Sequence, residues 1–288
     1  MKNKIISTCL FPLLVFGLLF WFGCGSASDV NLNGPANPGI GSPNGENPSG
    51  DTGENTDPAK DPSPETYLES FSGAEGAPWP SPWQIAENSN VLTAQISGGR
   101  AQLQGPTGVV ARMVQTDLDF LNCDGSFTVE FENFASQGCG FYCRQNGGYL
   151  TLSDPHGQGY AVFLEGNSGS LTLWYERDGD EIQHQSTPVG SILGGSLLNN
   201  TPYRVRMQVR QISPTETQQR AKLWPLGEAE PAEWHVVADE TPFFGEPPDN
   251  PLTIPELQNV TGGLALDIYN YGGTGSIFLS DLEVIDIP

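Results

Sequence analysis

The sequence predicts an all-β domain of antiparallel strands, built as a sandwich or a barrel. Short segments from residue 67 onwards alternate between apolar and polar side chains, which is the period of a half-buried strand. Turn residues separate these segments, and the chain contains 35 glycines and 24 prolines. No convincing amphipathic helix interrupts them. Many short strands at this spacing are typical of a larger jelly roll.

The alternation is strictest in two segments. Ser126–Phe134 places Phe127 and Val129 on one face, and Tyr203–Arg210 alternates apolar residues with arginine and glutamine. Asn167-Ser168-Gly169 is typical of a hairpin turn. We expect further strands at Leu68–Gly73, Ile96–Gly105, Gly148–Ser153, Tyr160–Gly166, Ser170–Glu176, Arg220–Trp224, Glu233–Asp239, Gly262–Asn270 and Ser276–Ile287.

The first 65 residues predict export and tethering. Residues 1–23 have a positive start and a long apolar run, as in a signal peptide, and Gly23-Cys24 resembles a bacterial lipobox with Cys24 as the lipidated residue. Trp21 departs from the usual leucine, so plain secretion or an uncleaved anchor stay open. Residues 24–65 are rich in Asn, Gly, Pro and Ser and predict a disordered tether. The folded domain is expected at 66–288, held by lipid to the bacterial outer membrane or cell surface.

The charge balance restricts the partners. The chain has 12 lysines and arginines and 34 aspartates and glutamates, which gives a net charge of −22. Such a chain has no electrostatic attraction for nucleic acid or for anionic lipid surfaces. The spare carboxylates are ligands that calcium accepts.

Four segments together resemble the concanavalin A-like lectin/glucanase superfamily, in its laminin-G-like bacterial branch. They are Leu68–Gly73 with nearby tryptophans, Ile96–Gly105, Thr201–Arg210 with Arg220–Trp234, and the closing Gly262–Val284. The resemblance implies a jelly-roll sandwich of two curved antiparallel sheets whose first and last strands pair. Domains of this family often hold a structural calcium ion, for which the candidate ligands here are Glu69, Asp267 and Asp281. The alternative is that these acids are ordinary strand-end carboxylates.

Catalysis is not predicted. Retaining glucanases of this fold carry Glu-x-Asp-x-Glu or Glu-x-Asp-x-x-Glu on one strand, and the sequence has neither pattern. The nearest pair is Glu130 and Glu132, which share one strand face. The alternative for this pair is a solvated sheet face, with Arg204 and Arg206 as neighbouring partners.

Three cysteines fall in the domain, namely Cys123, Cys139 and Cys143. In an oxidising envelope we expect two of them to form a disulfide and the third to be a buried thiol. An extended Cys139–Cys143 segment would hold its ends too far apart to bond. Either Cys123 bonds one of them, or this segment is bent.

Aromatic side chains at strand ends and turns indicate a sugar-binding surface, because the C–H faces of sugars stack on aromatic rings. The alternative for each is core packing. The segment Arg220–Trp234 also sets tryptophans among glutamates, but its Gly and Pro residues predict a solvated connection unsuited to a general acid. The candidates are Trp174, Tyr175, Trp224, Tyr269 and Tyr271, with Glu130 and Glu132 as polar partners.

We therefore expect a cell-envelope lipoprotein whose domain binds a polysaccharide or glycoconjugate without catalysis. Two rival functions stay open: a glycoside hydrolase with an atypical site, and a structural or adhesive surface protein that binds another protein. The sequence names no particular ligand.

Overall fold

The protein is described by a computed structural model that places residues 65–91, 93–105, 107–108, 110–166, 168–239, 254–272 and 275–288. The predicted signal peptide, Cys24 and the tether lie outside these described residues and stay predictions. Within the described ranges, no helix has the length and hydropathy needed to cross a membrane.

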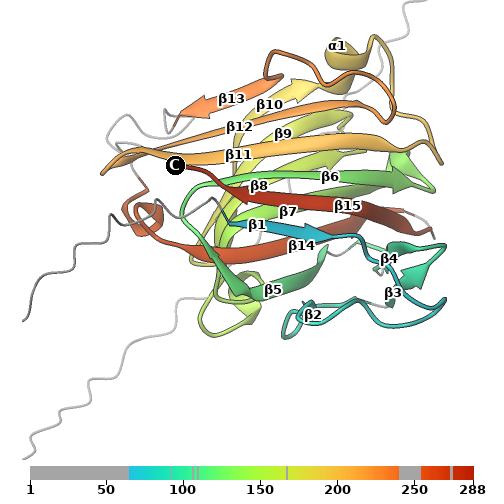
Figure 1. The fold of residues 1–288 in the computed structure, drawn as a ribbon, viewed down its shortest axis with the longest axis horizontal. Coiled ribbons are helices and arrows are strands. Elements are labelled where there is room, and N and C mark those ends of the chain that lie inside the picture. Colours follow the sequence, from blue (N-terminus) through green and yellow to red (C-terminus); the bar gives the residue numbers. More distant parts are fainter. Residues whose placement is uncertain are drawn as a thin grey trace, which may run out of the picture. The chain divides into compact units, whose positions relative to one another are not determined.

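The described chain forms two antiparallel sheets packed face to face, which confirms the predicted two-sheet jelly-roll sandwich (Figure 1). One sheet has eight strands in the order β13-β12-β11-β6-β15-β4-β3, with β1 paired to β15. Its strands are β1 (Thr66–Glu69), β3 (Thr93–Ser97), β4 (Arg100–Gln104), β6 (Cys123–Phe131), β11 (Tyr203–Ser213), β12 (Glu216–Pro225), β13 (Val236–Asp239) and β15 (Ile277–Asp286).

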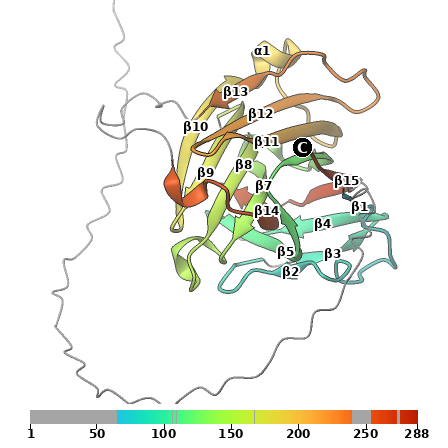
Figure 2. The same cartoon turned by 60° about the vertical axis from the view of Figure 1, so that its left-hand side comes forward.

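The other sheet has seven strands in the order β10-β9-β8-β7-β14-β5-β2. Figure 2 shows the two layers from the side and the bend of this second sheet between β10 and β5. Its strands are β2 (Gln84–Ile85), β5 (Val110–Phe120), β7 (Gln137–Asn146), β8 (Gln158–Glu165), β9 (Ser170–Arg177), β10 (Asp180–Pro188) and β14 (Gly262–Asn270).

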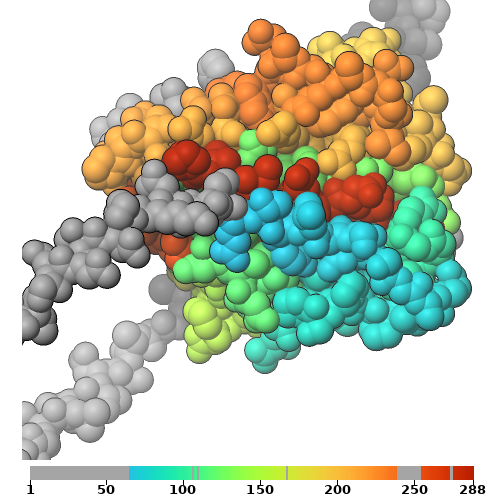
Figure 3. All heavy atoms as spheres, viewed as in Figure 1, coloured from blue at the N-terminus to red at the C-terminus, as the bar shows by residue number. Residues whose placement is uncertain are grey.

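The first and last strands pair, as the resemblance implies. Thr66 lies opposite Ile285 and Glu69 opposite Leu282 in an antiparallel register. In the space-filling view of Figure 3, the blue residues of β1 lie along the red residues of β15. Both ends of the described domain therefore meet on the eight-stranded sheet.

The strand prediction was wrong at Gly148–Ser153, which belongs to the loop between β7 and β8 and holds the 3₁₀ helix η2 (Leu150–Leu152). Gly147 and Leu150 adopt positive φ angles of 68° and 52°, which an extended strand does not allow. Strands β5 and β10 and the short helix α1 (Val189–Leu193) were not predicted. The remaining described elements are η1 (Phe134–Ser136) and η3 (Pro255–Leu257).

The main core lies between the sheets and is filled by aliphatic and aromatic side chains such as Phe127, Phe141 and Leu266. A disulfide between Cys123 on β6 and Cys143 on β7 joins the two sheets. Cys139 is a buried free thiol. This pairing is one of the alternatives that the sequence left open.

A second apolar cluster lies on the opposite face of the seven-stranded sheet. In β14, Leu264, Leu266 and Ile268 belong to the main core, whereas Ala265 and Tyr269 belong to this second cluster. All nine residues of β14 are therefore buried, because side chains cover both of its faces. We call the surface that carries this second cluster the outer face of the seven-stranded sheet.

Candidate functional site

Small residues at the centre of the outer face leave room for large neighbours. A Cβ atom on Gly140 would lie 2.4 Å from the ring of Phe163, and one on Gly138 would lie 2.0 Å from the ring of Tyr269. The two rings thus rest directly on the backbone of β7. Glycine at these two positions forms the floor of a hollow.

This hollow, which we call the aromatic hollow, has a volume of about 240 Å³. Four aromatic rings and two carboxylates line it, and they come from four different strands or their ends. A sequence window cannot show this gathering, since it depends on strand order. The lining residues are Val110 on β5, Phe163 and Glu165 on β8, Trp174 on β9, Glu181 on β10, and Tyr269 and Tyr271 at the end of β14.

The rings of the aromatic hollow stand at several angles to one another. Phe163 packs edge-on against Trp174 at 6.0 Å between centroids and nearly parallel to Tyr269 at 6.5 Å. Tyr271 is 56% exposed and lies 4.7 Å from the ring of Tyr269. Phe163 and Tyr269 are buried, so Tyr271 and the partly exposed Trp174 are the rings of the hollow that solvent reaches.

Hydrogen bonds fix the carboxylate of Glu165 in this hollow. Trp174 donates from Nε1 to Oε1 of Glu165 over 2.9 Å, while the hydroxyls of Ser168 and Ser170 donate to Oε2. The bond from Trp174 also sets the plane of its indole ring. A ligand would meet an acceptor and an aromatic face whose positions are already fixed.

A buried ionic network lies next to the aromatic hollow. Arg112 on β5 donates to both oxygens of Asp267 on β14 over 2.6 and 2.8 Å, and to Glu176 on β9 over 2.7 Å. All three side chains are fully buried. Three strands separate β5 from β9, so this contact requires side chains to converge over a concave sheet.

Glu181 connects the network to the hollow. Its Oε1 lies 3.8 Å from Nη2 of Arg112 and accepts a hydrogen bond from the hydroxyl of Tyr142. Tyr142 also lies under the guanidinium, 4.4 Å from its ring centroid to Cζ of Arg112. Since the side chain of Glu181 is 22% exposed, it is the member of the network that solvent reaches.

One arginine faces three carboxylates here, which shifts their protonation. Burial raises the pKa of Glu176 to about 7, and the contact with Arg112 opposes this shift only in part. Burial also raises the pKa of Asp267. For Glu181, burial and then the negative charge of Asp267 raise the pKa. Oε1 of Glu176 is buried and has no hydrogen-bond partner among the described residues, so no hydrogen bond to this oxygen offsets the effect of burial on the pKa.

The loop between β7 and β8, Gly147–Gly157, covers this network. Nη1 of Arg112 donates to the carbonyl oxygen of Gly148 over 3.0 Å, and the hydroxyl of Tyr149 donates to the carbonyl oxygen of Val110. Asn88 binds the loop from the far side through Leu152. The loop thus keeps water from the ionic network and leaves the aromatic hollow open beside it.

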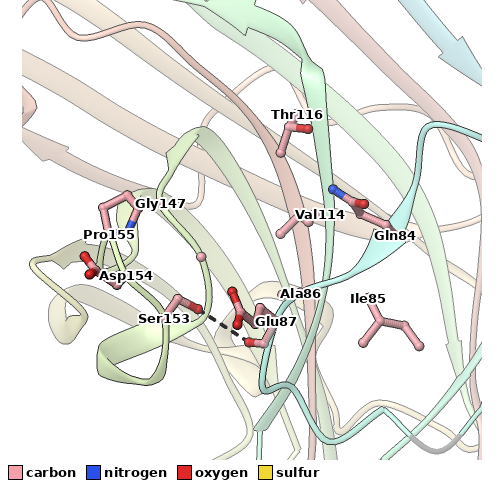
Figure 4. A pocket seen from close by; sticks show the side chains of 11 residues that line it. Gln84, Ile85, Ala86, Glu87, Val114, Thr116, Gly147, Ser153, Asp154 and Pro155 are labelled. Atoms are coloured by element: carbon pink, nitrogen blue, oxygen red, sulfur yellow. Dashed lines mark hydrogen bonds between the residues drawn. The ribbon is translucent and has the colours of Figure 1, made fainter.

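The same loop borders a second hollow of about 450 Å³ (Figure 4). Gln84, Val114 and Thr116 lie on its strand side, and Asp154 and Pro155 lie on its loop side (Figure 4). The hydroxyl of Ser153 closes the base by donating to the carbonyl oxygen of Glu87 over 3.4 Å. No aromatic side chain lines this second hollow.

Three of the five predicted aromatic candidates, Trp174, Tyr269 and Tyr271, meet in the aromatic hollow. Tyr175 alternates with Trp174 and packs into the main core. Trp224 is buried on β12 of the other sheet.

Glu130 and Glu132 also lie on the side of the other sheet. Glu130 pairs with Arg100 over 2.8 Å, in place of the predicted partners Arg204 and Arg206. Glu132 accepts a hydrogen bond from the backbone N–H of Ser276. Neither carboxylate lines the aromatic hollow.

The three calcium candidates do not form one site. Both oxygens of Asp267 accept hydrogen bonds from Arg112, which does not fit a calcium ligand. Glu69 and Asp281 line one hollow of about 280 Å³ with Glu283 and Arg204. Within the described ranges, no group of three or more acidic, histidine or cysteine side chains is arranged to hold a metal. Calcium binding stays a prediction.

Sequence reasoning missed Arg112, Glu165, Glu176 and Glu181. A signal existed for two of them: alternation places Glu165 on the face of Phe163, and Glu176 on the face of Trp174. Arg112 lies in a segment whose two faces are both largely buried, so it shows no clean alternation.

A scan against protein-family models finds no match to this chain, and a search of curated proteins finds none either. Solved structures with a similar course of the chain include a glycosidic hydrolase, with 9% identity, a TM-score of 0.48, and coverage of 77% of this chain and 96% of the other. A Bacillus licheniformis β-glucanase has 12% identity, a TM-score of 0.45, and coverage of 77% and 98%. The carbohydrate-binding module CBM66 from Bacillus subtilis has 9% identity, a TM-score of 0.43, and coverage of 74% and 98%. At this level, the similarity concerns the fold and assigns no ligand or reaction.

Proposed function

We propose that this domain binds a glycan, and that one sugar ring enters the aromatic hollow. The observation that carries the proposal is the convergence of Trp174, Tyr269 and Tyr271 with the carboxylates of Glu165 and Glu181. Aromatic faces stack on the C–H faces of sugars, and carboxylates accept hydrogen bonds from hydroxyl groups. The carbohydrate-binding module and the glucanase among the similar structures agree with this ligand class without carrying the argument.

The size of the hollow suits a single sugar unit. Its volume of about 240 Å³ is below the range of about 300–1,000 Å³ that holds drug-sized ligands. The second hollow, which the β7–β8 loop borders, offers polar groups to further units of a longer chain. We therefore expect the ligand to be a glycan chain that places one sugar unit in the aromatic hollow, and not a disaccharide that the hollow encloses completely.

A glycan array followed by calorimetry on the hits tests this proposal. Trp174→Ala should weaken binding at least about tenfold, because central aromatic contacts each contribute more than about 1 kcal/mol. Trp234→Ala is the matched control. Trp234 lies beneath Arg220 and Lys222 on the side of the other sheet, so its loss should leave affinity unchanged.

An array with no hits, or equal losses in the two tryptophan variants, would contradict glycan binding at the aromatic hollow. Capture of a protein partner in place of a glycan would favour the adhesive function.

A glycoside hydrolase is the second candidate, and the raised pKa of Glu181 favours it. A carboxyl that stays protonated beside another carboxylate is what a general acid requires. Burial and the negative charge of Asp267 raise the pKa of Glu181 in this direction, and its side chain lies at the edge of the aromatic hollow, where a ligand can reach it. Hydrolysis of an array hit that Glu181→Gln abolishes would establish this activity, and binding without product release would exclude it.

We further propose that the domain is exported and held to the bacterial outer membrane or cell surface by a lipid on Cys24. The apolar run before Gly23-Cys24 supports this, and the polar segment 24–65 supplies a tether. Labelling cells with a fatty-acid analogue should mark the protein, and Cys24→Ala should abolish the label and release the protein from the membrane fraction. A labelled Cys24→Ala variant would contradict the anchor.

A further inference from the structure

The charge of the aromatic hollow restricts the ligand further. Two carboxylates line it, and its lining contains no lysine, arginine or histidine. The nearest cation with a described contact to it is Arg112, which is fully buried and already bonded to Asp267 and Glu176. Arg112 also lies 3.8 Å from Glu181, so Asp267, Glu176 and Glu181 share this one cation. Carboxylates therefore outnumber cations around the hollow, which presents an excess of negative charge.

Glu181 keeps one oxygen available within this hollow. Its Oε1 faces Tyr142 and Arg112, whereas no hydrogen bond from a described residue engages Oε2. Glu165 differs, since its two oxygens accept three hydrogen bonds from Trp174, Ser168 and Ser170. A donor on the ligand thus finds a fixed carboxylate on one side and an open one on the other.

The aromatic rings add a second attraction for positive charge. The faces of Trp and Tyr rings attract a cation within about 6 Å of the ring centroid. Trp174, Tyr269 and Tyr271 surround one small volume, and the ring planes of the two tyrosines are tilted by 50°. A compact ammonium group can meet more than one ring face while it approaches a carboxylate. A flat, neutral sugar face, in contrast, stacks on only one aromatic ring at a time.

We propose that the aromatic hollow selects a glycan unit that carries a free, protonated amino group, that is, an amino sugar that is not N-acetylated. This inference rests on the proposed glycan function and names its ligand class. The same hollow repels a uronic acid, because the ligand's own carboxylate would face Glu165 and Glu181.

Matched pairs of sugars test the selection. Calorimetric or NMR titration of the full protein at pH 7 would compare glucosamine with N-acetylglucosamine, and galactosamine with N-acetylgalactosamine. Within each pair, the two sugars differ only in whether the amino group is free or N-acetylated. We expect the free amine to bind at least tenfold more tightly in one pair, an advantage that added salt reduces, and galacturonic acid not to bind.

Glu181→Gln should weaken binding of the amine much more than binding of the N-acetyl sugar, and so remove the advantage of the amine. Glu130→Gln, a carboxylate change on the other sheet, should preserve the advantage. Choline serves as a second source of an ammonium group. If choline binds at the aromatic hollow and the amino sugars do not, the cationic selection stands and the glycan function fails.

Two other outcomes separate the inference from the proposed function. If the N-acetyl sugars bind as tightly as the amines, glycan binding stands and the amine selection is overturned. If no sugar and no choline binds, both are overturned.

Discussion

The ion pairs on the two sheets differ in burial. On the eight-stranded sheet, acids and bases pair at the solvent boundary, as Arg100 does with Glu130 at 2.8 Å and side-chain exposures of 34% and 17%. On the seven-stranded sheet, Arg112 and Glu176 pair at 2.7 Å with no exposure at all. The distances match, so the difference between the two pairs is burial and the number of carboxylates that share the cation.

This difference distinguishes the seven-stranded sheet, which carries the aromatic hollow, from the eight-stranded sheet. On the eight-stranded sheet, Arg206 bonds Asp124 and Glu230, and Lys222 bonds Glu230, so the charges of these four residues balance one another. On the seven-stranded sheet, glycines make room for rings, and excess carboxylates lie at the edge of a hollow. Local charge imbalance beside aromatic surface distinguishes a ligand site from a solvated sheet face.

The largest expected effect comes from removing the buried cation. Arg112→Met leaves Asp267 and Glu176 buried without their partner, which should cost about 3–5 kcal/mol of unfolding free energy. Arg100→Met, which breaks the exposed pair at the same distance, should cost about 1 kcal/mol or less. Urea unfolding of the two variants measures both values. Equal losses would show that burial does not separate the two surfaces.

A pH effect of similar size is expected from Glu176. Its pKa is 4.5 in the unfolded reference and about 7 in the folded protein, so the folded state holds more protons between these values. Stability should therefore be highest below about pH 4.5 for this group and fall by about 3 kcal/mol as the pH rises through 7. Glu176→Gln should flatten this part of the curve, and Glu130→Gln should not. A wild-type curve that rises from pH 5 to 8 would contradict the raised pKa.

A smaller effect is expected from filling the floor of the hollow. Gly140→Ala brings a methyl group to 2.4 Å from the ring of Phe163, which must move into the aromatic hollow. We expect a loss of about 1–3 kcal/mol in stability, together with loss of ligand binding. Gly190→Ala is the control, because a Cβ there meets no atom within 4 Å. Unchanged binding by Gly140→Ala would place the ligand elsewhere.

The sequence predicted the fold better than the site, for a physical reason. Strands buried on one face alternate visibly, as Tyr203–Arg210 does, and pairing follows from such patterns. The strand β5 was missed because the loop Gly147–Gly157 buries its outer face too. The same loop contains Gly148–Ser153, which was predicted as a strand from its apolar spacing. Hydrogen bonds from this segment to Arg112 and Val110 hold it in a loop instead.

The site residues needed strand order as well as alternation. Trp174 and Tyr269 were recognised as aromatic candidates, but only the order β9-β8-β7-β14 brings both of them against the ring of Phe163. Glu130 and Glu132 were selected by adjacency on one strand. The acids that do gather, Glu165 and Glu181, lie on different strands, and a sheet's curvature cannot be obtained from a sequence window.

The smallest expected effect concerns calcium on the eight-stranded sheet. With Asp267 committed to Arg112, the remaining candidates are Glu69 and Asp281, which share their hollow with Glu283 and with the opposing charge of Arg204. Weak binding should raise the melting midpoint by only a few degrees at calcium concentrations far above the dissociation constant, since stabilisation grows with the logarithm of ligand concentration. Asp281→Asn should remove that shift and Asp267→Asn should not, although the latter lowers the midpoint itself by disturbing Arg112. Identical midpoints in EDTA and in excess calcium would exclude a calcium ion from this domain, and the charge of Arg204 would then be the physical reason.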